Sequence, residues 1–133
     1  MATSVGILND EQVLDVLKRR RMGRLSCAAD GFKRISAVRY DTGDGPDLYV
    51  QTPDPECLEL LQANPRVRLE VDDVQGPSQW ETVLGWGRLE KVDRNDRHAR
   101  PAGGRFDKAP LYKIRLDSVR GFYRTGSGAR HLD

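Results

Sequence analysis

The segment of residues 58–92 constrains the fold more than any other part of the chain, because a short helix is followed in it by two strand patterns. Asp54 is a good N-cap for this helix and Pro55 suits its first position. Pro65 must lie beyond its end, since proline lacks the N–H that a helix needs. Apolar and charged residues then alternate over residues 67–72, and a longer strand with two glycines follows. This order predicts a small, mainly β domain.

Length and composition favour one domain over residues 1–133, because the chain suffices for a single hydrophobic core. No apolar run is long enough to span a membrane, and the first residues lack the pattern of a secretory signal. Cys27 and Cys57 are too few for a disulfide framework, so we expect free thiols and a cytoplasmic location. His98 and His131 have no further ligands at metal spacing, and no metal site is expected.

A leading helix is predicted within residues 1–22. Asn9 is a good N-cap with a glutamine three residues later, and apolar residues recur at helical spacing over Asp10–Arg21. Gly23 is predicted to end this helix. The basic run of residues 18–21 falls in the last turn, where cations interact favourably with the helix dipole. We favour that interpretation over a nucleic-acid site, and we expect neither a nucleic acid nor a membrane as partner.

The rest of the chain is typical of short strands separated by turns. Asp30-Gly31 favours a tight hairpin, since both of its turn positions need positive φ, and Asp117-Ser118 predicts a further turn. Such spacing with few helices favours an antiparallel barrel, because closure removes exposed edges. Strands are expected at about residues 24–29, 33–40, 47–51, 67–72, 80–92, 111–116 and 119–123, with a polar loop at 73–79, a mobile loop at 93–109 and a flexible tail at 125–133.

The order of helix, Asn64-Pro65-Arg66-Val67, strand, polar loop, tryptophan, strand and Gly87-Arg88 resembles the pyridoxamine 5′-phosphate oxidase-like family of FMN-binding split barrels. Met22-Gly23-Arg24-Leu25-Ser26 is similar to the family's strand after the opening helix, and Gly121-Phe122-Tyr123 to part of its closing pair of strands. The small nitroimidazole-resistance-type branch is the most similar. The resemblance implies a mainly β chain folded as an antiparallel split β-barrel with short helices. It also implies a homodimer with FMN in the groove between the two subunits.

The same resemblance implies where the cofactor would be bound. Family members hold the FMN phosphate from the second predicted strand, which here carries Arg34, Ser36 and Arg39. Arg34 and Arg39 are five residues apart and point to opposite faces of a strand, so both can serve only across a bulge. Thr52 matches a hydroxyl of the family's phosphate loop, and Trp80 matches a tryptophan that contributes to the flavin pocket of the neighbouring subunit.

Cys57 stands where the family commonly has a lysine that grips the phosphate, and Glu56 precedes it. A carboxylate repels a phosphate, and a neutral cysteine contributes no compensating charge. Three outcomes follow from this difference: weaker FMN binding, a deazaflavin or another flavin-like ligand, or a barrel with no cofactor.

The resemblance implies a flavin (FMN)-dependent oxidoreductase of unknown substrate, in which the cofactor supplies the chemistry. No catalytic side chain is expected, since no acid–base constellation occurs in the sequence, and Arg88 is expected to form a structural ion pair. A true pyridoxamine 5′-phosphate oxidase is not expected, because the segment that helps to grip pyridoxal phosphate is missing after the seventh predicted strand. The alternative is a ligand-binding or structural dimer without turnover.

Overall fold

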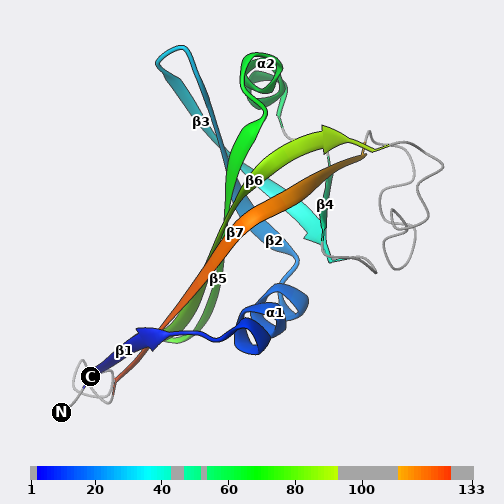
Figure 1. Cartoon of the computed structure of the whole chain (residues 1–133). Helices are drawn as coiled ribbons and strands as arrows, with labels where there is room; N and C mark the ends of the chain where they lie inside the picture. Colours follow the sequence, from blue (N-terminus) through cyan, green and yellow to red (C-terminus); the bar gives the residue numbers. More distant parts are fainter. Residues whose placement is uncertain (1–2, 43–46, 52–53, 93–110, 127–133) are drawn as a thin grey trace.

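The computed structural model describes residues 3–42, 47–51, 54–92 and 111–126, and this part of the chain is mainly β (Figure 1). None of its helices is long and apolar enough to cross a membrane. In chain order the elements are β1 Thr3–Ile7, α1 Asp10–Arg19, β2 Met22–Ala29, β3 Phe32–Asp41, β4 Leu48–Gln51, α2 Pro55–Ala63, β5 Arg66–Gly76, β6 Gln79–Lys91 and β7 Leu111–Gly126.

Six of these strands close into an antiparallel ring in the order β7-β4-β3-β2-β5-β6, and β6 pairs with β7 again. Closure pairs the edges of the ring, so the predicted split β-barrel is confirmed. The ends of β5, β6 and β7 extend beyond the ring as an arm, which β1 joins at the outer edge of β7 (Figure 1). The hairpin of β2 and β3 rises at the other end, beside α2.

The core fills the ring because strands such as β5 and β6 alternate buried and more exposed residues, and β4 adds three buried residues in succession. Helix α1 adds its apolar stripe to the same core. Tyr40 is buried there and its hydroxyl donates a hydrogen bond of 2.7 Å to the backbone carbonyl oxygen of Leu17. Burial raises the pKa of Tyr40 above its ordinary value. The least exposed core side chains include Val16, Leu25, Tyr40, Val50, Leu69, Val71, Val83 and Ile114.

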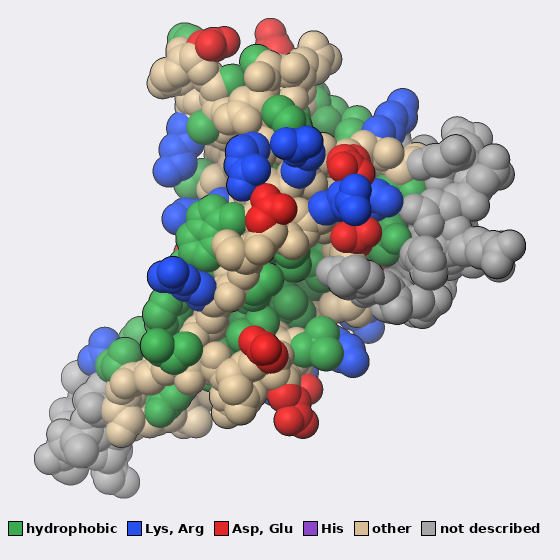
Figure 2. All heavy atoms as spheres, viewed as in Figure 1, with side chains coloured by type: hydrophobic (Ala, Val, Ile, Leu, Met, Phe, Trp, Pro, Cys, Tyr) green, Lys and Arg blue, Asp and Glu red, His purple; other side chains and the backbone are tan. Residues whose placement is uncertain are grey.

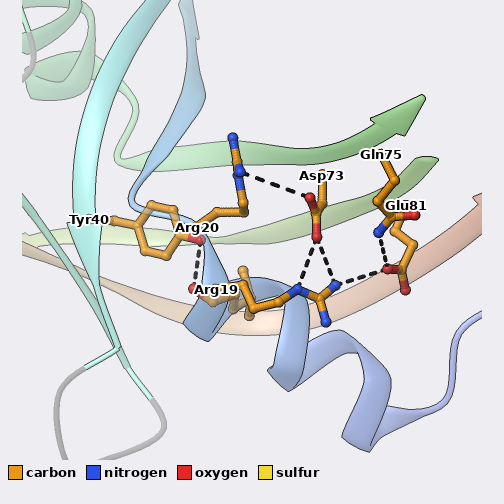
Figure 3. A network of polar contacts seen from close by, with 7 residues as sticks. Arg19, Arg20, Tyr40, Asp73, Gln75 and Glu81 are labelled. Atoms are coloured by element: carbon orange, nitrogen blue, oxygen red, sulfur yellow. Dashed lines mark hydrogen bonds and ion pairs between the residues drawn. The ribbon is translucent and has the colours of Figure 1, made fainter. Parts of the chain in front are cut away.

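A polar network fixes the end of α1 to β5 and β6 (Figure 3). Arg19 Nε donates to Asp73 Oδ2 at 2.9 Å, and Arg19 Nη2 donates to Glu81 Oε1 at 2.9 Å. The hydrogen bond to Asp73 raises the pKa of Arg19. Arg20 lies 3.9 Å from the other oxygen of Asp73, whose residue is 8% exposed. The basic run at the end of α1 therefore has structural ion-pair partners.

Gly23 does not end the helix, because α1 stops at Arg19 and Gly23 lies inside β2. A Cβ atom at this position would lie 2.9 Å from Leu69 Cδ1 and 3.0 Å from the carbonyl oxygen of Glu70. The glycine is thus explained by the close approach of β5 rather than by a helix cap. The capping box that was predicted at Asn9 is present.

The turn predicted at Asp117-Ser118 is wrong, since β7 is one strand with a bulge. Gly87 pairs with Leu116 while Trp86 pairs with Ser118, which leaves Asp117 as the extra residue. The polar loop is shorter than predicted, because β5 continues to Gly76.

Strand β1 was not predicted, and its pairing with β7 includes Thr125 and Gly126, which were assigned to the tail. The residues predicted as a mobile loop, 93–109, lie outside the described part of the chain.

Candidate functional site

The residues predicted to hold a flavin phosphate can be located on β3. Arg34 and Ser36 share one face of this strand, where Arg34 pairs with Cys27 and Ser36 with Leu25 of β2. Ser36 is buried and Arg34 is exposed. Both side chains contact residues at the start of α2, because the helix packs against β2 and β3 at this end of the ring.

Asp54, the N-cap of α2, joins these residues. Its Oδ1 accepts a hydrogen bond of 2.8 Å from the backbone N–H of Cys57, and its Oδ2 accepts one of 3.2 Å from Arg34 Nε. The backbone N–H of Asp54 in turn donates to Ser36 Oγ at 3.4 Å. The pKa of the Asp54 carboxyl is lowered, first by the Cys57 N–H and then by Arg34 and Ser36. The cluster therefore holds a carboxylate and a guanidinium at a helix N-terminus.

Glu56 provides a second carboxylate for Arg34. Arg34 Nη1 lies 3.1 Å from Glu56 Oε2, and the Glu56 side chain is 71% exposed. Next to this pair an open groove of about 530 Å³ runs between α2 and the β2–β3 hairpin. Its lining residues are Ala29, Asp30, Phe32, Lys33, Arg34, Glu56, Glu59, Leu60 and Ala63.

Two carboxylates contact Arg34, and only one of them can leave it without loss of a helix cap. Arg34 is 44% exposed and can offer its guanidinium to the groove, whereas Asp54 must stay in place to cap α2. Glu56 is free to rotate into solvent because so little of it is covered. Arg34 and the Ser36 hydroxyl would then be the donors to a phosphate.

The other predicted site residues do not join this cluster. Arg39 is on the opposite face of β3, since the register from Met22↔Arg39 to Ala29↔Phe32 runs without a bulge. Thr52 lies outside the described residues. Trp80 is on the outer face of β6, where the guanidinium of Arg124 stands 5.1 Å from the centre of its ring.

Cys57 is not a free thiol, and that prediction is wrong. It forms a disulfide with Cys27, with 5.8 Å between the two Cα atoms, and both residues are fully buried. Two cysteines 30 residues apart gave no sign of this, because only the fold brings α2 onto β2. The Cys57 side chain points into the core and does not line the groove, so the position of the family's lysine offers nothing to a phosphate here.

Within the described ranges, no group of three or more His, Cys, Asp or Glu side chains could hold a metal ion. The role of Asp54 and Glu56 as partners of Arg34 was not predicted. The helix signal at Asp54 and Pro55 was recognised, but nothing in the local sequence shows that Arg34 of β3 faces it.

Comparisons with known proteins agree with the fold. The sequence model of the family described as pyridoxamine 5′-phosphate oxidase matches residues 9–118. An uncharacterized protein of Rhizobium meliloti (strain 1021) is 24% identical over 88 residues, which make up 66% of this chain and 58% of that relative.

Solved structures are similar over nearly the whole chain. A FAD-binding protein from Mesorhizobium loti has a TM-score of 0.73 and 26% identity, and the similarity covers 94% of this chain and 100% of that one. The FAD-binding protein from Mycobacterium smegmatis has a TM-score of 0.69 and 20% identity, with 92% and 100% covered. A proposed 5-nitroimidazole antibiotic resistance protein from Bacteroides thetaiotaomicron has a TM-score of 0.68 and 13% identity, with 93% and 90% covered.

Proposed function

The chain belongs to the pyridoxamine 5′-phosphate oxidase family, and from this premise we propose that it binds a flavin whose phosphate lies against Arg34 and Ser36. One observation carries the proposal. These two residues share a face of β3 at the N-terminus of α2, where a guanidinium, a hydroxyl and the positive end of a helix dipole converge. The resemblance found in the sequence supports this proposal, because it implies that the family's phosphate is held from this strand.

The proposed activity is that of a flavin-dependent oxidoreductase. A bound flavin would supply hydride transfer, and the chain would only bind and orient it. FMN is the proposed flavin, and FAD must be tested beside it because two of the similar structures are FAD-binding proteins.

A second candidate function is a dimer that binds no flavin and has no turnover. The ion pairs of Arg34 with Asp54 and Glu56 favour it, because two carboxylates already neutralise the guanidinium that a phosphate would need. The proposed homodimer is common to both candidates. A cytoplasmic location stays a prediction, and the disulfide removes the argument from free thiols on which it partly depended.

Titration of FMN, FAD and riboflavin into the purified protein tests the proposal. We expect FMN to bind, and we expect Arg34→Ala to weaken FMN binding by about 1.5–3 kcal/mol, the usual contribution of a hydrogen bond to a charged group. Riboflavin lacks the phosphate and should bind both forms alike. Arg39→Ala is the matched control, since it removes the same charge from the other face of β3.

Glu56→Gln should strengthen FMN binding, because it removes the carboxylate that competes for Arg34. A protein that binds none of the three flavins would favour the candidate without a cofactor. Equal losses for riboflavin and FMN in Arg34→Ala would show that Arg34 supports the fold or the ring and not the phosphate.

A further inference from the structure

Four arginines and a tryptophan gather on the outer face of the barrel, away from the Arg34 cluster. In the strand register Arg66 pairs with Arg88, Arg88 with Arg115, and Arg68 with Trp86. Their neighbours in sequence on β5 and β6, Val67, Leu69, Gly87 and Leu89, are buried, so the side chains of β5 and β6 between them point outward. We call these five residues the outer arginine patch.

Only two of the four arginines in the patch have a nearby acidic partner among the described residues. Arg66 Nη2 lies 3.0 Å from Asp117 Oδ2, and Arg115 Nη1 lies 3.8 Å from Glu90 Oε1. Neither Arg68 nor Arg88 has an acidic partner within ion-pair distance in the described part of the chain. The structural ion pair expected for Arg88 is therefore absent among these residues. Like charges directly opposite each other on a sheet are destabilising, so an anion bound between them would be stabilised.

Trp86 gives the patch an apolar, planar component. It is half-buried on the outer face, directly across from Arg68 and two residues from Arg88. A hollow of about 390 Å³ borders the patch at Arg66, Arg88 and Arg115, and Asp47, Glu90, Leu116 and Asp117 complete its lining. Trp86 and Arg68 lie outside this hollow. An aromatic face next to uncompensated guanidinium groups is suited to a planar ring that carries an anionic group.

The extent of the positive region limits the size of such a ligand. Asp47, Glu90 and Asp117 stand on one side. Glu70, which already forms an ion pair with Arg24, stands on the other. Figure 2 likewise shows basic side chains standing close to acidic ones over the upper part of the barrel. A nucleic-acid strand needs a long positive path, whereas this one is bounded by carboxylates, so a single nucleotide is favoured.

We propose that the outer arginine patch is a binding site for a mononucleotide-sized aromatic phosphate. The ring stacks on Trp86, and the phosphate accepts hydrogen bonds from Arg68 and Arg88. This site is independent of the flavin site, because Arg34 lies on β3 beside α2 and contributes nothing to it. It is also separate from Trp80, which lies six residues before Trp86 on β6, a distance of about 20 Å along the strand.

AMP is the probe for this site, with adenosine and inorganic phosphate as its two halves. In a Trp80→Phe background Trp86 is the remaining tryptophan, so its fluorescence reports the patch directly. We expect saturable quenching by AMP, at least tenfold weaker binding of each half, and weaker AMP binding at higher salt. Arg68→Ala and Arg88→Ala should each weaken AMP binding by about tenfold or more, as for a lost charge-assisted hydrogen bond.

Lys18→Ala is the control, because it removes one positive charge outside the patch, and it should bind AMP as the parent does. Trp86→Leu should bind AMP as weakly as it binds phosphate. Calorimetry measures the binding, and circular dichroism checks that the variant is folded.

The proposal is overturned if AMP binds no better than inorganic phosphate, or if Arg68→Ala and Arg88→Ala bind AMP normally. Much tighter binding of a short single-stranded oligonucleotide than of AMP would overturn it in favour of a nucleic-acid surface.

Discussion

At the scale of single residues, Asp54 has two tasks that can be separated by substitution. Its Oδ1 caps α2 and its Oδ2 accepts a hydrogen bond from Arg34. Because the folded pKa of Asp54 is lowered, its carboxylate stabilises the folded chain above the ordinary value of 3.8. That stabilisation is lost as the pH falls through the lower, folded pKa.

Asp54→Asn should keep the cap and lose the ion pair, whereas Asp54→Ala loses both. At pH 7 we expect Asp54→Ala to be less stable than Asp54→Asn by about 1 kcal/mol, the usual contribution of an N-cap. The loss of stability of Asp54→Asn relative to the parent should be smaller than that of Asp54→Ala. This loss should decrease as the pH falls below 3.8. Thermal unfolding across this pH range measures both effects, and a deficit of Asp54→Asn that grows in acid would contradict the assignment.

Gly87 and Gly76 offer a second comparison of single residues. A Cβ atom on Gly87 would meet the backbone carbonyl oxygen of Arg115, which cannot rotate away, while a Cβ on Gly76 would have nothing within 4 Å. Gly87→Ala should therefore destabilise the protein by about 1–3 kcal/mol, as overpacking does, and Gly76→Ala should change little. Urea unfolding of the two variants checks this. Equal stabilities would show that the backbone of β7 shifts at its bulge to make room for the added methyl group.

At the scale of elements, the disulfide joins α2 to β2 across 30 residues of sequence. By the chain-entropy model such a crosslink stabilises the folded state by about 3–4 kcal/mol. We expect the melting temperature of the oxidised protein to fall when a dithiol reductant is added. The double variant Cys27→Ala/Cys57→Ala should not respond to the reductant. Two alkylated cysteines in denatured but unreduced protein would show that the crosslink does not form.

Local signals predicted the elements well where chemistry acts within a few residues. The caps at Asn9 and Asp54 and the alternation of β5 all depend on neighbours in sequence, and all are confirmed. Gly23 and the turn at Asp117 were misread because a glycine and a polar pair have more than one structural use. Close approach of β5 explains the first, and a bulge opposite Gly87 explains the second.

The candidate site was less predictable because its charges come from different elements. The sequence placed Arg34 and Ser36 on one face of a strand, and the register agrees. It could not show that Asp54 and Glu56 would reach Arg34, or that Cys57 would turn into the core, since both depend on how α2 packs. The outer arginine patch likewise needs the register of three strands.

At the scale of the whole molecule, the outer face of the arm carries apolar side chains that no described residue covers. Ile7 pairs with Phe122 and Val5 with Arg124, and Val5 and Ile7 are 71% and 78% exposed. Figure 2 shows apolar side chains along this arm. Val74, next to Trp80 in the register, extends the same surface. Contiguous exposed apolar surface of this kind marks an interaction site.

The proposed homodimer would bury this arm, so light scattering at micromolar protein should give twice the chain mass of 15.0 kDa. The double variant Ile7→Asp/Phe122→Asp should be monomeric, because buried carboxylates without partners oppose association. Phe32→Asp is the matched control, since Phe32 is 71% exposed but lies at the tip of the β2–β3 hairpin and should leave the dimer intact. A monomeric parent would rule out a flavin groove shared between two subunits. A dimer broken by Phe32→Asp and kept by the arm variant would move the interface to the hairpin.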